Sequence, residues 1–228
     1  MTYALILAVW SLFGSGPHAE QHYTLTVSSA PHVLVATANG KVTVRTGRIG
    51  SPLEVTVTKR ADTLDQVKAL GAQVQRVGNS VTIRAVYPQN CGTGSCGGEV
   101  SFDIVTPPGT ELDASTSNGS ITATGIGANA RLKSSNGSVN ASYASLTGVT
   151  AIALSTSNGS IALGLPSSAR IGRLRMDTSV GRIASDWPVN VDRNNFVGGS
   201  VDQTLARGAT SITLTTTNGS ITLRKSAP

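Results

Sequence analysis

A four-residue motif, Asn-Gly-Ser followed by Ile or Val, recurs along this chain and limits its fold more than any other feature. Between residues 97 and 218 the motif and its degenerate forms return in six steps of 18 to 22 residues, or about 20 residues per unit. Such a period is typical of repeat architectures, in which each unit packs only against its neighbours. Near-identical copies begin at Asn118, Asn136, Asn158 and Asn218, an earlier copy begins at Asn39, and degenerate copies begin at Gly97, Val180 and Gly198.

Within each unit, apolar and polar residues alternate with a period of two, which indicates half-buried strands. In the unit that begins at Asn118, Ile121 and Ala123 share one side of the predicted strand, and Thr122 and Thr124 share the other. Aromatic residues make up 4% of the chain and charged residues 13%, so long amphipathic helices and a core of large rings are both excluded. The sequence therefore predicts an all-β protein with a thin aliphatic core.

The Asn-Gly pairs have two interpretations. Asn-Gly is a strong signal for a two-residue hairpin, which predicts an antiparallel meander. Alternatively, each pair turns one corner of a solenoid coil, and the asparagines of successive coils stack. The unit length and the single fixed corner favour a single-domain parallel β-solenoid with coils of about 20 residues. The predicted turn residues are Asn39, Gly40, Asn118, Gly119, Asn136, Gly137, Asn158, Gly159, Asn218 and Gly219.

The series TSNGSI, SSNGSV and TSNGSI, with VSFDIVTPPGTELDAS before it, resembles the bacterial putative-adhesin family of β-strand-repeat domains of unknown function. That family is similar to the head domains of auto-transporter adhesins. The resemblance covers roughly Tyr23 to Arg224 and is tightest from Gly98 onward. It implies a right-handed parallel β-helix and a cell-envelope location, and it implies no established reaction.

The N-terminal segment, residues 1–19, is predicted to be a signal peptide. The apolar run from Ala4 to Gly14 has the length of a signal sequence, and the expected cleavage point follows Ala19. The alternative is a buried first strand. No later segment is long and apolar enough to cross a membrane, so we expect an exported protein in the periplasm, at the cell surface or secreted.

Residues 20–228 are expected to form one domain, with irregular N-terminal coils over 23–90 and regular repeats over 97–224. A short helical turn is expected from Asp62 to Leu70, because Leu64, Val67 and Leu70 share a face. Cys91 and Cys96 flank a glycine-rich loop, and in an oxidising compartment we expect them to form a disulfide. A metal site would need two more soft ligands, and the redox spacing of Cys-x-x-Cys is absent.

No catalytic residue, cofactor or metal ligand is predicted. Asp103 and Asp186 share a position within their coils, but four coils would separate them by about 19 Å, whereas paired carboxylates act within about 10 Å. The histidines, His18, His22 and His32, all lie near the start of the chain, and no nucleophile elbow is present. The alternative is a carbohydrate-active enzyme, a glycan lyase or hydrolase built on a β-helix.

Two features are candidates for binding. The net charge is +6, and Arg170, Arg173, Arg175 and Arg182 fall within one predicted coil, where an anionic polymer is a suitable ligand. Rows of outward Ser and Thr, for example Thr122 and Thr124, suit glycans or another protein. Because solvated surface faces explain both features equally simply, they stay hypotheses; basic runs interleaved with aromatics are absent, which excludes nucleic acid.

The sequence therefore predicts a non-catalytic cell-envelope or secreted β-repeat protein with an adhesive or scaffolding role. The expected partners are glycans, envelope polymers or surface proteins. End-to-end assembly through the terminal strands is a further hypothesis.

Overall fold

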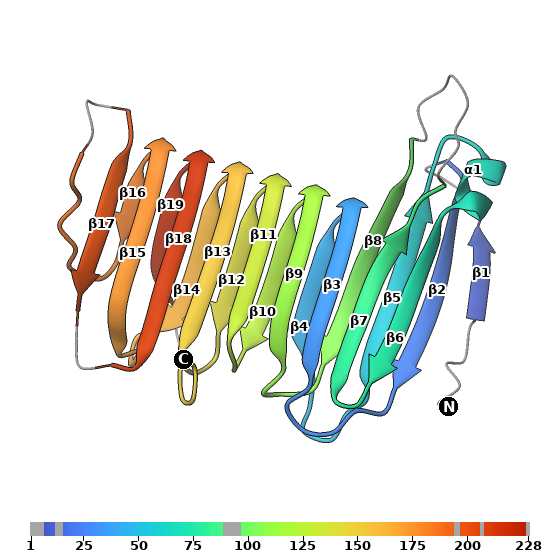
Figure 1. The fold of residues 1–228 in the computed structure, drawn as a ribbon, viewed down its shortest axis with the longest axis horizontal. Helices are drawn as coiled ribbons and strands as arrows, with labels where there is room; N and C mark the ends of the chain where they lie inside the picture. The colour runs from blue at the N-terminus through green and yellow to red at the C-terminus, as the bar shows by residue number, and fades with distance from the viewer. Residues whose placement is uncertain (1–6, 12–15, 89–96, 194–196, 206–207, 227–228) are drawn as a thin grey trace.

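The computed structural model describes residues 7–11, 16–88, 97–193, 197–205 and 208–226, and these form two stacked β-sheets with one short helix (Figure 1). Sheet A, at the back of Figure 1, has the spatial order β1 (Leu7–Ser11), β2 (His18–Leu25), β5 (Leu53–Arg60), β8 (Glu99–Thr106), β4 (Val42–Thr46), β10 (Ile121–Ile126), β12 (Val139–Tyr143), β14 (Ile161–Pro166), β19 (Ile221–Ser226) and β16 (Ile183–Ser185). Sheet B, at the front, has the order β17 (Gly199–Thr204), β15 (Ile171–Val180), β18 (Thr210–Asn218), β13 (Ala151–Asn158), β11 (Ala130–Asn136), β9 (Glu111–Asn118), β3 (His32–Asn39), β7 (Ser80–Val86) and β6 (Gly71–Val77). The prediction of an all-β protein is confirmed.

The basic unit is a layer, which we define as one strand of sheet B and the strand of sheet A that follows it in the chain. In the layer β9/β10, for example, the chain rises through β9, turns at Asn118 and Gly119, and descends through β10. In this and the neighbouring layers, alternate residues of each strand point inward. Ile121 of β10, Leu132 of β11 and Ile152 of β13 are therefore almost completely buried between the sheets. Adjacent layers pair in parallel, which supports the corner interpretation of Asn-Gly over the hairpin interpretation.

The layers do not stack in chain order. The last layer of the chain, β18/β19, lies between β13/β14 and β15/β16. At the other end, β3/β4 lies between β7/β8 and β9/β10. Both ends of the stack therefore contain an exchange of two layers.

Beyond the layers, both sheets continue with antiparallel strands: β6 pairs with β7, β17 with β15, and β5, β2 and β1 follow β8. The sheets do not close, and the layer order is broken. A right-handed parallel β-helix is therefore not confirmed. The stack departs from regular chain order at the two layer exchanges, where the chain passes the level of one layer before it forms the next.

Two degenerate copies of the motif are not corners. In the copy that begins at Gly97, Gly98 was expected to occupy the corner level with Gly40. Val42 pairs with Phe102, however, so the residue level with Gly40 is Val100, and the copy is displaced from the corner. Gly198 and Gly199 lead into β17, which runs antiparallel to β15. The prediction of corners at these two positions is wrong, because a short glycine-containing motif also suits the start of a strand.

The helical turn expected from Asp62 to Leu70 is confirmed as α1 (Leu64–Ala69). Its N-terminus is a capping box, in which Thr63 and Gln66 exchange side-chain-to-backbone hydrogen bonds. In Figure 1, α1 lies near the end of the stack where sheet A extends past sheet B, and it contacts β2.

In the predicted signal segment, Leu7–Ser11 form the edge strand β1, and Ala19 lies inside β2. Cys91 and Cys96 lie outside the described residues. No helix in the described part is long and apolar enough to span a membrane.

Candidate functional site

The Asn-Gly corners form one continuous edge of the molecule. The corner asparagines from Asn118 onward each donate a side-chain hydrogen bond to the Oδ1 of the preceding asparagine of the series, with donor–acceptor distances of 2.7 to 2.9 Å. The resulting asparagine ladder consists, in spatial order, of Asn39, Asn118, Asn136, Asn158 and Asn218. Its amides are engaged with one another, which makes the ladder a structural element of the corner.

Glycine is required after each asparagine because the backbones of adjacent layers approach closely at this level. A Cβ atom on Gly137 would lie 2.1 Å from the carbonyl oxygen of Gly119, and one on Gly159 would lie 2.2 Å from that of Gly137. No side chain fits at such distances without moving the main chain.

A second ladder, which sequence reasoning missed, lies inside the corner. Two residues before each corner asparagine lies a buried Thr or Ser whose hydroxyl donates to a main-chain carbonyl of the adjacent layer. The acceptor is a glycine carbonyl in every case except Thr37, which donates to Val100 O. Thr156 bonds to Gly137 O at 2.8 Å, and Thr216 bonds to Gly159 O at 2.9 Å. The signal was present in the sequence as [Ser/Thr]-x-Asn-Gly.

The asparagine ladder ends where the sequence lacks asparagine. At one end, the Tyr87 hydroxyl accepts from Asn39 N and donates to Asn39 O, both at 2.9 Å. At the other end, the corner of β15/β16 carries Val180, which pairs with Asn218. The layer exchanges thus keep the five asparagines contiguous and put the layers without asparagine outermost.

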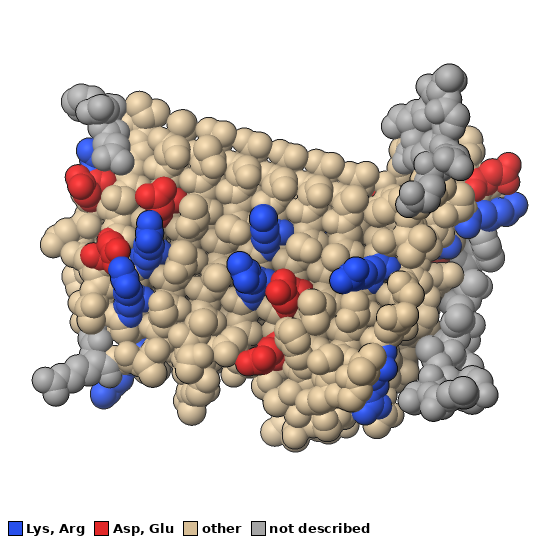
Figure 2. Space-filling model, in the orientation of Figure 1, with Lys and Arg blue, Asp and Glu red and all other residues tan. Residues whose placement is uncertain are grey.

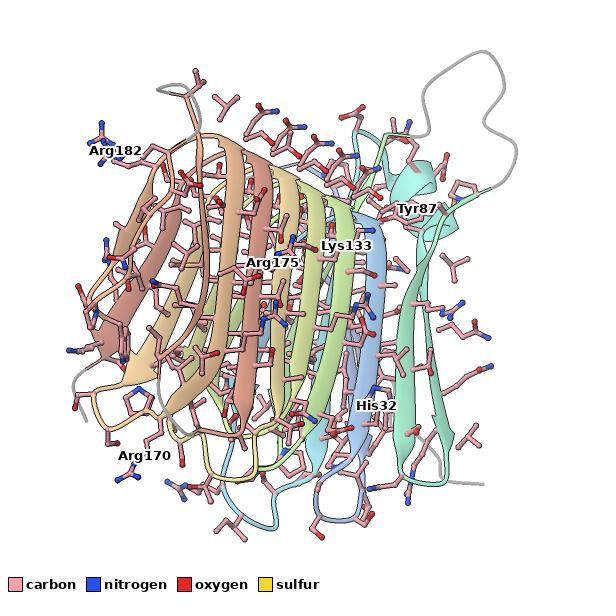
Figure 3. All side chains as sticks on the ribbon, turned by 60° about the vertical axis from the view of Figure 1, so that its left-hand side comes forward. His32, Tyr87, Lys133, Arg170, Arg175 and Arg182 are labelled. Carbon is pink, nitrogen blue, oxygen red and sulfur yellow. The ribbon has the colours of Figure 1, made fainter. Side chains whose placement is uncertain are left out.

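The four arginines predicted as an anion site are not brought together. Figure 3 shows Arg182 and Arg170 near opposite edges of the molecule, with Arg175 on the face of sheet B between them. Arg173 is paired with Asp202 of β17 through two hydrogen bonds of 3.0 and 2.9 Å. This pairing raises the pKa of Arg173 and lowers the pKa of Asp202. The ten-residue length of β15 separates Arg170 from Arg182, which precludes a shared site.

Charged side chains of both signs are scattered in a band across the outer face of sheet B, as Figure 2 shows. One row across it consists, in successive strands, of Ala36, Ser115, Lys133, Ser155, Thr215 and Asp177. The hydroxyls of Ser115, Ser155 and Thr215 make no hydrogen bond to other described residues. We call these three residues the hydroxyl row; Ser155 and Thr215 lie on neighbouring strands, about 4.8 Å apart, and Lys133 separates Ser155 from Ser115.

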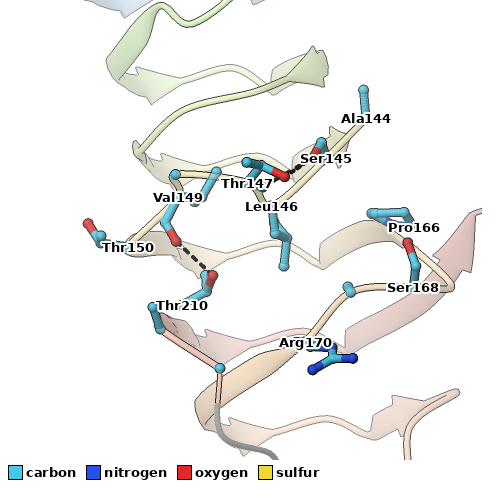
Figure 4. A pocket seen from close by; sticks show the side chains of 14 residues that line it. Ala144, Ser145, Leu146, Thr147, Val149, Thr150, Pro166, Ser168, Arg170 and Thr210 are labelled. Carbon is cyan, nitrogen blue, oxygen red and sulfur yellow. Dashed lines mark hydrogen bonds between the residues drawn. The ribbon is translucent and has the colours of Figure 1, made fainter.

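The loop edge, opposite the asparagine ladder, contains a cavity of about 420 Å³ that we call the edge pocket (Figure 4). Three loops surround it: residues 144–150, 166–170 and 208–210. The layer exchange explains the cavity, because the chain leaving β14 has to pass the level of β18 before it begins β15. The backbones cross so closely here that a Cβ on Gly208 would lie 2.1 Å from Arg170 O.

Two hydrogen bonds hold the wall of the edge pocket. Thr210 donates its hydroxyl to Val149 O at 2.7 Å, and Ser145 donates to Thr147 Oγ1 at 3.0 Å. The side chains of Ser168 and Arg170 are exposed and make no hydrogen bond or ion pair within the described part of the chain.

Carboxylates do not converge on any of these features. Asp103 lies on β8, whereas Asp186 follows β16, and six strand spacings in sheet A, about 29 Å, separate their levels. This separation exceeds the 19 Å expected from chain order because the layers are exchanged at both ends. Over the described residues, no group of three or more His, Cys, Asp or Glu is arranged to hold a metal ion.

Comparison with solved structures gives this architecture a counterpart. A crystal structure from Clostridium sporogenes ATCC 15579, described as a putative cell adhesion protein, aligns with a TM-score of 0.60 at 11% identity, over 91% of this chain and 99% of that chain. The two chains share one fold. A crystal structure described as a putative adhesin from Bacteroides fragilis NCTC 9343 aligns over 93% and 98% of the two chains at 11% identity, with a TM-score of 0.32.

Neither a protein-family model nor a curated protein matches the chain. The resemblance to adhesins that the repeat indicated is confirmed by the solved neighbours, and at 11% identity it extends to the fold alone.

Proposed function

We propose that this chain is an exported, non-catalytic module of the cell envelope, with an adhesive or scaffolding role. In this proposal the stack of layers is a rigid, solenoid-like rod, and its outer surface binds glycans, envelope polymers or surface proteins. The shared fold with a protein described as a putative cell adhesion protein supports the proposal.

The observation that carries the proposal is the different use of hydroxyls inside and outside the stack. The buried hydroxyls, such as those of Thr156 and Thr216, are bonded to glycine carbonyls. The hydroxyl row on sheet B has no such partner among the described residues and lies on the outer face of the sheet. Unpaired hydroxyls on neighbouring strands suit contact with an extended polar polymer, whose own hydroxyls supply the missing partners.

Binding of the purified full chain to envelope material tests this proposal. We expect the chain to sediment with a bacterial envelope fraction containing peptidoglycan and surface polysaccharide. Replacing Ser155 and Thr215 with Glu should weaken this binding at least tenfold, because it places two like charges in the hydroxyl row. Ala162→Glu with Thr222→Glu is the matched control, since these directly opposed residues belong to the same two layers but lie on sheet A.

Two results would count against the proposal. Equal weakening by both double variants would show that charge, and not the hydroxyl row, governs binding. Release of new reducing ends from the polysaccharide by the wild-type chain would show turnover, and would favour a glycan-cleaving enzyme.

A further inference from the structure

The edge pocket is a concave feature of the described stack that the repeat does not explain. Two of its walls are loops of successive layers, residues 144–150 and 166–170. The third wall, residues 208–210, follows β17 in the chain and joins them because β18/β19 is inserted before β15/β16. A cavity of about 420 Å³ is within the size range of small-ligand sites, about 300 to 1,000 Å³.

The lining combines an apolar base with a few polar groups. Leu146, Val149 and Pro166 provide carbon surface, of which Val149 is the most buried. Ser168 has an unpaired hydroxyl, and Thr147 retains its own hydroxyl hydrogen because its oxygen already accepts from Ser145. This mixture suits a ring that has both C–H surface and hydroxyl groups, as a sugar does.

Charge narrows the ligand class further. Arg170 is the charged residue among the described lining residues, and the lining contains no carboxylate. Unlike Arg173, whose guanidinium is held by Asp202, Arg170 has no anionic partner in the described part of the chain. A guanidinium binds a carboxylate through two parallel hydrogen bonds.

From these observations, we propose that the edge pocket binds an acidic sugar residue of a glycan. Arg170 binds the sugar carboxylate, Ser168 and Thr147 bind ring hydroxyls, and the apolar base contacts the face of the ring. This inference rests on the proposed function, because it adds to the hydroxyl row a second contact, through which the module binds acidic sugar residues of the same envelope polymer.

Calorimetric titration of the full-length chain with trimeric oligogalacturonate tests the inference, with trimeric galactan as the neutral probe. We expect saturable binding of the acidic trimer and at least tenfold weaker binding of the neutral one. Arg170→Gln should weaken the binding of the acidic trimer at least tenfold, and Ser168→Trp, which fills the pocket, should abolish it. Both residues are exposed, so the melting temperature should stay unchanged.

Arg224→Gln is the matched control, because it removes the same charge from an exposed arginine on sheet A. Its binding of the acidic trimer should stay within twofold of wild type. Equal binding of both trimers, or equal loss in Arg170→Gln and Arg224→Gln, would overturn the inference. Binding to the envelope fraction without binding of the acidic trimer would also overturn it and leave the proposed function standing, whereas binding to neither material would contradict the proposed function itself.

Discussion

The side-chain amide of Asn218 donates a hydrogen bond of 2.8 Å to Oδ1 of Asn158, which precedes it by 60 residues. The corner that comes between them in the chain carries Val180 and lies outside this pair. A valine between two asparagines would interrupt the ladder on both of its sides, whereas at the end of the stack it interrupts nothing. The hydrogen-bonding capacity of the corner residue therefore favours the observed order of layers.

The first prediction concerns the length of the asparagine ladder. Val180→Asn should extend the ladder by one hydrogen bond to Asn218 and raise the free energy of unfolding by about 0.5 to 1 kcal/mol. Asn136→Ala should remove two ladder bonds and lower the free energy of unfolding by about 1 to 2 kcal/mol. Urea denaturation measures both changes. Ser135→Ala, at the residue beside Asn136, is the control and should be nearly neutral; destabilisation by Val180→Asn would contradict the prediction.

The second prediction concerns the buried hydroxyls. Thr216→Val keeps the shape of the side chain but leaves the carbonyl of Gly159 without its hydroxyl donor, so it should cost about 1 to 3 kcal/mol. Thr215 immediately precedes Thr216 in β18 and faces solvent, so Thr215→Val is a matched control that should change stability by less than about 0.5 kcal/mol. Equal effects of the two substitutions in urea denaturation would show that the buried hydroxyl bond has no special role.

The third prediction concerns the corner glycines. Gly137→Ala should destabilise the fold by about 3 kcal/mol or more, because its Cβ would lie 2.1 Å from a backbone oxygen of the next layer. Gly127 has open space around its Cβ position, so Gly127→Ala should be tolerated. The melting temperatures of the two variants check this, and a normal melting temperature for Gly137→Ala would contradict the close approach of the layers.

The fourth prediction concerns pH and Lys59, which is buried and donates to Leu70 O at 3.0 Å. Burial lowers the pKa of Lys59, so between this lowered value and about 10.4 the unfolded chain binds more protons than the folded one. The contribution of Lys59 to stability should therefore rise with pH through this window and fall as pH decreases. Lys59→Met should lose this rise, which denaturation of both proteins between pH 7 and 10.5 measures; parallel pH profiles would contradict the assignment.

The corners were predictable from the sequence because their chemistry is local. Asn-Gly at Asn118, Asn136 and Asn158 fixes both the turn and the level at which layers pair. The order of the layers was not predictable from the period, because every layer presents the same motif in the same register. The replacement of asparagine by Val180 was the signal that a layer belongs at the end of the stack.

The same division between local features, which the sequence predicts, and long-range order, which it does not, applies to the candidate site. Sequence proximity grouped Arg170 with Arg182, but the direction of β15 places them at opposite edges. The edge pocket was not predictable, since residues 208–210 reach its other two loops only through the insertion of β18/β19. The buried position of Thr216 could have been found from the recurring hydroxyl two residues before each corner.

The layer exchange, on which both the ladder and the edge pocket depend, is tested most directly by engineered disulfides. Ala153 of β13 pairs with Thr213 of β18, and Thr213 in turn pairs with Arg175 of β15. In a Cys91→Ser, Cys96→Ser background, cysteines at 153 and 213 should crosslink under mild oxidation, because neighbouring strands lie about 4.8 Å apart. Cysteines at 153 and 175, two strand spacings apart at about 9.6 Å, should not. Crosslinking of 153 with 175 but not with 213 would show that the layers stack in chain order and would contradict this account.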